Sequence, residues 1–274
     1  MMNCLICSQK MYFYFCKSFT ERHLSNVDYY RCENCGFCIS KTHVEMSPEA
    51  FSEMNIDLHS QYQFTDINPA DPRWKSRLQA QADVIADLYQ LGLLEHSKPW
   101  LDYACGDGSL SDLLATHYRL ELQKYDRYLP EQSSYLGPQD IVSGGFDLVI
   151  TTSVFEHLTK RKHFDEINSL VSDNGVMGLH TMVREVVPQD PTWFYLLPPH
   201  CALHTNKSME ILFEQWGYRS SIYHVDSRIW FWFKSDPQRI EEIVGKANDR
   251  RNHIAQSAPL CYEFKKGFVD YWKE

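Results

Sequence analysis

The sequence lacks three features that mark large functional classes. No stretch approaches the ~20 consecutive apolar residues that a helix needs to cross a bilayer, so we expect no membrane span. Basic residues are in the minority, 27 against 36 acidic ones, and the net charge is −9. This balance disfavours a broad nucleic-acid surface, because phosphates would not be neutralised over a wide area. The start "MMNCLICSQK" lacks the basic and apolar segments of a secretory signal, so we expect a cytoplasmic protein.

Cysteines, in contrast, are plentiful and clustered near the start of the chain. Cys4 and Cys7 form one C-x-x-C pair, and Cys32 and Cys35 form a second. In a reducing compartment, clustered cysteines favour metal binding over disulfides. Each pair makes a tight turn that aims two thiolates at one point, and two pairs supply the tetrahedral shell that zinc prefers. The sequence therefore predicts a zinc ribbon.

Other cysteines leave the identity of the four ligands open. Cys38 forms a rival pair with Cys35, and Cys16 is a further candidate ligand. Four thiolates leave no open coordination position, which favours a structural zinc over a catalytic one. A segment of ~40 residues buries too little surface to fold without such a metal. A redox role is disfavoured, because no βαβ pattern lies beside the pairs.

Beyond residue 72, patterns typical of helices and strands alternate. Leu78, Ala82 and Ile85 recur at helical spacing, and "GFDLVITTS" has the apolar run of a strand buried on both faces. The segments "YRSSIYHV" and "RIWFWFK" predict a hairpin near the end. This order predicts an α/β fold with a Rossmann-like, doubly wound, mostly parallel sheet and an antiparallel C-terminal hairpin.

The same patterns suggest four segments along the chain. We expect the zinc ribbon in residues 1–44 and a linker with one short helix in residues 45–72. The α/β domain spans residues 73–236. Residues 237–274 form a helical tail with one long and one shorter helix.

The stretch "LDYACGDGSL", residues 101–110, predicts a binding site. It follows a short buried strand, and Gly106 and Gly108 allow a ligand to approach the backbone closely. In doubly wound sheets, ligands lie across the carboxyl ends of the strands. The glycine loop, Asp126 after the second strand and the segment after Ile150 all fall at that edge.

These stretches resemble motifs of a known family. "LDYACGDGSL" resembles motif I of the class I S-adenosylmethionine-dependent methyltransferases, with Ala104 at the usual first glycine. "KYDRY" resembles the second motif, and "FDLVITTSVFEHL" resembles the fourth-strand motif. With the cysteine pairs in front, the chain is similar to zinc-containing bacterial methyltransferases, some of which modify deoxysugars or related small molecules. The resemblance implies S-adenosylmethionine as cofactor and a small-molecule acceptor.

Residue types at these positions suit that cofactor. Asp102 suits its ammonium group, and Asp126 lies about 20 residues after Gly106, where a carboxylate accepts hydrogen bonds from ribose hydroxyls. The segment between Asp126 and Phe146 is short for this family, so the acid that reads adenine is hard to place, and Asp140 is the candidate. The predicted cofactor-binding residues are Asp102, Ala104, Cys105, Gly106, Gly108, Asp126, Asp140, Ser153 and Phe155.

Three alternatives compete with this interpretation. A dehydrogenase shares the acid spacing, but Ser111 occupies the third glycine position of its G-x-G-x-x-G fingerprint. A non-catalytic relic whose ribbon recruits a partner would not need to keep the glycine loop bare. An RNA or protein methyltransferase is a third option, disfavoured for nucleic acid by the acidic balance and by the lack of an Asn-Pro-Pro-Tyr signature. The sequence does not decide the oligomeric state.

Three residues are candidates for catalysis. Methyl transfer is an in-line displacement, and a base is needed only when the nucleophile must lose a proton. His157 follows Glu156 just beyond the fourth strand, and Tyr195 and His200 lie in the Pro-rich stretch "TWFYLLPPHCALHTNKS". This stretch resembles a segment of sugar C-methyltransferases in which a Tyr and a Glu-His pair act on substrate. His200 matches the histidine, but the acid is missing before it, which leaves O- or N-methylation open.

Overall fold

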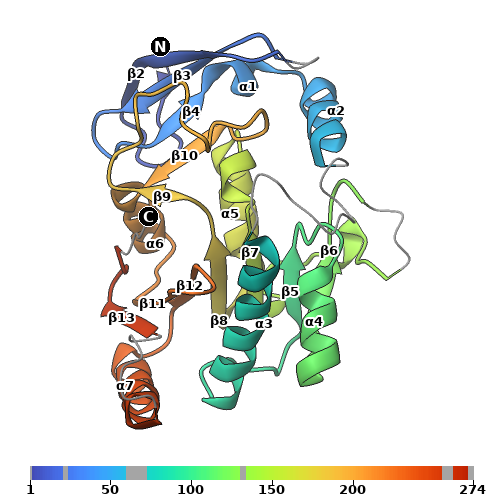
Figure 1. Cartoon of the computed structure of the whole chain (residues 1–274), viewed down its shortest axis with the longest axis vertical. Coiled ribbons are helices and arrows are strands. Elements are labelled where there is room, and N and C mark those ends of the chain that lie inside the picture. The colour runs from blue at the N-terminus through green and yellow to red at the C-terminus, as the bar shows by residue number, and fades with distance from the viewer. Residues whose placement is uncertain (1, 21–23, 60–72, 130–133, 255–261, 271–274) are drawn as a thin grey trace.

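Alternating apolar strands and amphipathic helices build the central part of the molecule, shown in Figure 1. The structure is a computed structural model, and it describes residues 2–20, 24–59, 73–129, 134–254 and 262–270. Within these residues the strands form a seven-stranded sheet and a six-stranded sheet. No helix among the described residues is long and apolar enough to cross a membrane.

The seven-stranded sheet confirms the predicted fold class. Its order is β13-β11-β12-β8-β7-β5-β6. The four strands β5 to β8 run parallel, and β12, β11 and β13 add antiparallel neighbours at one side. The strands are β5 (Trp100–Tyr103), β6 (Gln123–Tyr125), β7 (Phe146–Thr152), β8 (Val171–His180), β11 (Ser220–His224), β12 (Ile229–Phe233) and β13 (Tyr262–Lys266).

Helices cover both faces of this sheet, because successive strand residues point to opposite sides. Leu148 and Ile150 pack with one set of helices, and Val149 between them packs with the other. The first set is α3 (Trp74–Gln90), α4 (Ser109–Tyr118) and α7 (Pro237–Ile254), and the second is α5 (Arg161–Leu170) and α6 (Asn206–Gln215). Short 3-10 turns, η1 (Pro138–Asp140) and η2 (Phe155–His157), lie in the connections.

The six-stranded sheet joins the N-terminal ribbon to a distant part of the chain. Its order is β1-β2-β3-β4-β10-β9, and β4 pairs antiparallel with β10. In Figure 1 the blue ribbon strands and the orange β10 lie side by side above the central sheet. The strands are β1 (Met2–Asn3), β2 (Lys10–Ser18), β3 (Asn26–Cys32), β4 (Cys38–Ser40), β9 (Val183–Arg184) and β10 (Ala202–Thr205).

Two helices follow the ribbon, α1 (Lys41–Glu45) and α2 (Pro48–His59). The short helix expected in the linker is α2, and the rest of that linker, residues 60–72, lies outside the described residues.

The C-terminal tail corrects one prediction. Its first helix is α7, as expected, but the second predicted helix is wrong, because Tyr262–Lys266 forms β13. This strand pairs antiparallel with β11 at the edge of the sheet, where Tyr262 faces His224. Tyr262 is fully buried against the core that α3 and α7 share. Pairing with an open strand edge therefore decides the structure of this segment over local helical propensity.

Candidate active site and cysteine cluster

Polar residues gather at the carboxyl ends of the four parallel strands. Asp102 lies near the end of β5, and Asp126 directly follows β6. After β7 the chain turns at Ser153, whose φ is 57°, and its N–H donates to the carbonyl of His180 at the end of β8. The parallel pairing of β5 with both β6 and β7 places these ends at one edge of the sheet.

The glycine loop between β5 and α4 is bent back on itself. Ala104, Gly106 and Gly108 all have positive φ, at 59°, 57° and 75°. The Cys105 N–H donates to the Tyr125 carbonyl at 3.1 Å, which ties the loop to β6. A Cβ added at Gly108 would lie 2.7 Å from the Lys124 side chain, whereas one at Gly106 would meet nothing within 4 Å. Gly106 therefore faces open space. At Gly108 the close atoms belong to the flexible end of Lys124, so its positive φ is what favours glycine there.

Two buried carboxyl groups flank this loop. Asp126 accepts hydrogen bonds from the N–H groups of Gly106 at 3.0 Å and Tyr128 at 2.8 Å. Asp102 is 2% exposed, and only its Oδ2 is approached by a donor, the Ser111 hydroxyl at 3.5 Å. Its Oδ1 is buried with no hydrogen-bond partner among the described residues. Burial and the neighbouring Asp126 raise the pKa of Asp102 to about 7, so this site suits a ligand that brings a cation.

Tyr135 belongs to the same loop, although the sequence gave no reason to single it out. Its hydroxyl donates to the Gly106 carbonyl at 2.8 Å, and its backbone forms a parallel bridge with Lys124 in β6. The contact crosses from the segment after β6 to the loop after β5, and no local motif signals it. Tyr135 thus helps to fix the conformation of the glycine loop.

A second polar cluster lies beyond β7 and β8, centred on Glu156. This side chain is 1% exposed, and its two oxygens accept hydrogen bonds from the hydroxyls of Tyr195 and Thr181, both at 2.8 Å. The Met182 N–H donates to the Tyr195 hydroxyl at 3.2 Å. Burial raises the pKa of Glu156, and burial together with Glu156 raises the pKa of Tyr195 well above its usual value. Tyr195 therefore keeps its proton and donates it in the hydrogen bond to Glu156.

The two predicted catalytic histidines meet at this cluster. The ring centroids of His157 and His200 lie 5.1 Å apart with the planes at 82°. The Nδ1 atom of His200 lies 2.8 Å from the Tyr195 carbonyl, and the two rings are 4.4 Å apart. Burial lowers the pKa of His200 to about 4, so its ring is neutral near pH 7. The structure thus brings Tyr195, His157 and His200 together.

Not every predicted cofactor-binding residue lies in these clusters. Asp140 is exposed in η1 and accepts from the Gly137 N–H at 2.8 Å. Phe155 is buried between Phe164 and His204, with ring centroids at 5.2 Å and 6.0 Å. Their role in cofactor binding stays a prediction, as does that of Ser153.

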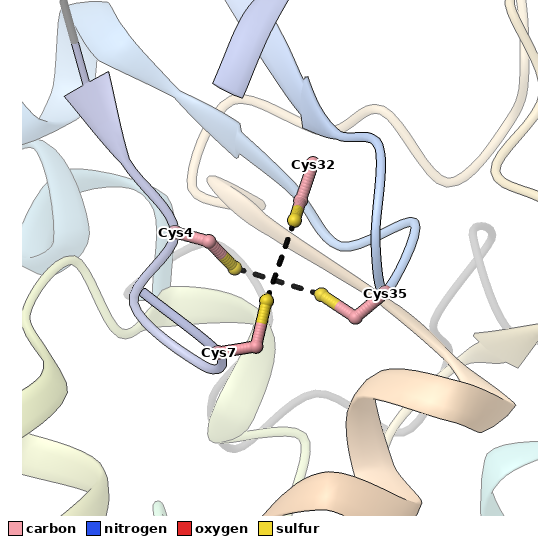
Figure 2. A group of neighbouring side chains, drawn as sticks. All are labelled: Cys4, Cys7, Cys32 and Cys35. Atoms are coloured by element: carbon pink, nitrogen blue, oxygen red, sulfur yellow. Dashed lines mark hydrogen bonds between the residues drawn. The ribbon is translucent and has the colours of Figure 1, made fainter. Parts of the chain in front are cut away.

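The four predicted zinc ligands converge in the ribbon. Figure 2 shows the sulfur atoms of Cys4, Cys7, Cys32 and Cys35 pointing at one another. The Sγ atoms of Cys4 and Cys35 are 3.5 Å apart, those of Cys7 and Cys32 are 3.4 Å apart, and all lie within 4.8 Å. This set is compatible with a tetrahedral metal site.

The two rival cysteines lie elsewhere in the ribbon. Cys38 is buried and donates to the Gly36 carbonyl at 3.5 Å. Cys16 lies in β2, where Asp28 and partial burial raise the pKa of its thiol.

The ribbon holds the connection between β8 and β10, residues 181–201, here named the β8–β10 segment. The Ser40 N–H donates to the Cys201 carbonyl at 2.8 Å, and the Tyr29 hydroxyl donates to the His200 carbonyl at 3.0 Å. His43 Nε2 lies 2.8 Å from the Pro198 carbonyl. The segment that carries Tyr195 and His200 is therefore fixed from the ribbon side.

The chain has similarities to known proteins in structure and in a domain family. No curated protein matches the chain in sequence. Three similar solved structures are methyltransferases or are described as such. Magnesium protoporphyrin IX methyltransferase from Synechocystis, solved with S-adenosylhomocysteine, is 15% identical, with a TM-score of 0.47 over 70% of this chain and 100% of that one. The plantazolicin methyltransferase BpumL is 13% identical, with a TM-score of 0.44 over 78% and 94%. A putative sarcosine dimethylglycine methyltransferase from Galdieria sulphuraria is 14% identical, with a TM-score of 0.42 over 76% and 86%.

The sequence profile of a family described as "Methyltransferase domain" matches residues 73–221, which is more than half of the chain. The match begins just before α3 and ends in β11, so it includes the glycine loop, both acidic residues beside it and the Glu156 cluster. The chain therefore belongs to the methyltransferase domain family and is an S-adenosylmethionine-dependent methyltransferase of the class I fold.

Proposed function

We propose that the chain transfers a methyl group from S-adenosylmethionine to an oxygen or nitrogen atom of a small-molecule acceptor. In this proposal the cofactor lies across the carboxyl ends of β5 and β6, and the acceptor lies toward the β8–β10 segment. A structural zinc ion held by Cys4, Cys7, Cys32 and Cys35 supports that segment. When bound, the cofactor supplies an electrophilic methyl group next to a cationic sulfur.

The unpartnered oxygen of Asp102 carries the proposal. A buried carboxylate without a compensating partner is costly, and a ligand ammonium group relieves that cost. The methionine portion of the cofactor has such a group, and the open space over Gly106 lets it approach the backbone. Asp126 already orders the loop through two N–H groups and keeps further acceptor capacity for ribose hydroxyls.

The acceptor half of the site rests on Tyr195, His157 and His200. Tyr195 is a positioning residue, since its hydroxyl holds Glu156 and its carbonyl holds the His200 ring. The carbonyl oxygen is only an acceptor, so Nδ1 of His200 carries the proton and Nε2 keeps its lone pair. In this proposal that lone pair accepts the proton that a nucleophile loses, and the His157 ring lies beside it, with ring centroids 5.1 Å apart. Both halves lie at the carboxyl edge of the same sheet, because Glu156 and His157 follow β7, which pairs parallel with β5.

Calorimetric titration of the zinc-loaded protein with S-adenosylhomocysteine tests the cofactor half. We expect micromolar binding, weakened about 10- to 150-fold in an Asp126→Asn variant because charge-assisted hydrogen bonds contribute ~1.5–3 kcal/mol. Glu121 is an exposed acid just before β6, the strand that Asp126 follows. Glu121→Gln is therefore the matched control and should bind S-adenosylhomocysteine normally. Titration of Asp140→Ala with S-adenosylhomocysteine tests the predicted adenine contact. Titration of the unmodified protein with NAD tests the dehydrogenase alternative. A folded protein that binds no S-adenosylhomocysteine would contradict the proposal.

A further inference from the structure

We propose that Glu156, His157 and His200 form a second metal site, for a divalent cation that activates a hydroxyl group of the acceptor. This inference rests on the proposed function, because it assigns how the acceptor half of that site works. It is separate from the cysteine cluster, which lies in the ribbon and uses other ligand types.

The three side chains have the composition and spacing of a metal site. One carboxylate oxygen and one nitrogen from each ring all lie within 4.8 Å of one another. Two imidazoles and one carboxylate leave coordination positions open for water or substrate, as catalytic sites require. The ligands come from two places in the chain, since Glu156 and His157 lie in η2 and His200 lies just before β10. The Cys201 N–H donates to the Glu156 carbonyl at 2.9 Å, which fixes the two places together.

The surrounding hydrogen bonds orient these ligands as metal ligands are oriented. A ligating histidine usually donates its second ring N–H to a carbonyl or carboxylate, and ligating carboxylates are themselves hydrogen-bonded. His200 places Nδ1 against the Tyr195 carbonyl at 2.8 Å, which leaves Nε2 as the coordinating atom. Glu156 is held on one oxygen by Tyr195 and on the other by Thr181, and each oxygen keeps a second lone pair. Tyr195 thus positions two of the three ligands.

The ligand types define the cation and the acceptor. Imidazole and carboxylate suit manganese, iron or zinc ions, whereas four thiolates select zinc. A cation at this site would bind a hydroxyl oxygen of the acceptor and lower its pKa, so the O–H proton passes to solvent water. The oxygen lone pair then forms the new O–C bond while the methyl C–S bond breaks, and its electrons stay on the sulfur. The site therefore points to an O-methyltransferase whose acceptor is an alcohol or phenol.

Mn²⁺ is the probe, because it binds thiolate ligands weakly and gives an electron paramagnetic resonance signal. Protein whose zinc content has been brought to one ion per chain, checked by metal analysis, is titrated with Mn²⁺, and the free Mn²⁺ is counted from its signal. We expect one Mn²⁺ bound per chain, with nitrogen coupling in the pulsed spectrum. His157→Ala and His200→Ala should each weaken binding at least 10-fold, whereas the exposed His117→Gln in α4 should bind as the unmodified protein does.

Two further measurements separate the possible outcomes. Tyr195→Phe keeps all three ligands but removes a hydrogen bond to Glu156, so Mn²⁺ binding should weaken about 10- to 100-fold. S-adenosylhomocysteine titrations of the same variants should be unchanged, which distinguishes loss of the metal site from loss of the cofactor site. Mn²⁺ bound without nitrogen coupling, or bound equally by the histidine variants, would overturn the inference. No binding to protein that still binds S-adenosylhomocysteine would overturn it as well, and would leave His200 as a metal-free base.

Discussion

The hydroxyl of Tyr29 links the ribbon to the candidate acceptor site, and its removal has a defined expected effect. It donates to the backbone carbonyl of His200 at 3.0 Å, in a fully buried position. The Tyr29 ring stacks on Phe15 with centroids 4.9 Å apart. A Tyr29→Phe variant keeps this stacking and loses only the hydrogen bond, so its effect reports the link itself.

The size of the expected effect follows from the His200 carbonyl, which Tyr29→Phe leaves without this hydrogen-bond donor. A buried carbonyl that loses its donor costs ~1–3 kcal/mol, more than the ~1 kcal/mol net value of an average hydrogen bond. Because the lost bond is local to the β8–β10 segment, most of this cost should appear as easier local opening of that segment. A change of 1–3 kcal/mol corresponds to a roughly 5- to 150-fold rise in the opening equilibrium.

Amide hydrogen exchange read by mass spectrometry measures this opening directly. In Tyr29→Phe, peptides covering residues 195–205 should exchange about 5- to 150-fold faster, while peptides from β5 and the glycine loop should not change. Tyr30→Phe is the matched control, because Tyr30 is the next residue in β3 and packs edge-on against Phe13. Unchanged exchange in residues 195–205, or equal acceleration in both variants, would refute the view that the ribbon fixes the acceptor half.

Four other predictions address the cofactor loop and the cysteine cluster. Burial and Asp126 raise the pKa of Asp102 to about 7, so S-adenosylhomocysteine affinity should fall as the pH falls below 7, and Asp102→Asn should flatten that profile. Asp102 binds its proton more tightly in the folded state than in the unfolded state. The free energy of unfolding of the unliganded protein should therefore rise as the pH falls from about 7 toward 3.8. Urea titrations measure this rise, which should be absent in Asp102→Asn. Gly106→Ala and Gly92→Ala both place a Cβ at a residue with positive φ and nothing within 4 Å, so each should cost ~1–2 kcal/mol of stability. Only Gly106→Ala should also weaken S-adenosylhomocysteine binding, and Gly92→Ala is the control. Purified protein should hold one zinc per chain by metal analysis, and Cys7→Ser should lower that content while Cys16→Ser should not, a result that equal losses would contradict.

The parts of the site that lie next to each other in sequence were predictable. A strand, a bare loop and a helix follow one another over residues 100–118, so the strand–loop–helix order around the glycines and Asp102 could be predicted directly, whereas their role in cofactor binding stays a proposal. The same holds for the cysteine pairs. Each C-x-x-C turn places two thiols next to each other locally, so a single tertiary contact between the two turns brings all four thiols together. The sequence favoured Cys4, Cys7, Cys32 and Cys35, and these four converge.

The acceptor half depends on contacts that no local pattern encodes. The acid expected before His200 is missing from that stretch, yet Glu156 supplies a carboxylate to the same cluster from another segment. Similarly, β13 is a strand because β11 offers it an open edge, and Tyr135 reaches the glycine loop only through the tertiary fold. Pairings between distant segments decided these features, and the local sequence pattern of a single chain carries no signal for them.

The two halves of the site therefore depend on different parts of the molecule. The cofactor half rests on the parallel strands β5 to β7. The acceptor half also rests on β10, which pairs with β4, and on His200, whose carbonyl accepts a hydrogen bond from Tyr29 of the ribbon. The ribbon thus also fixes the position of His200, through the hydrogen bond from the Tyr29 hydroxyl to the His200 carbonyl. Changes in the ribbon should alter acceptor handling with little effect on cofactor binding, and changes in the glycine loop should do the reverse.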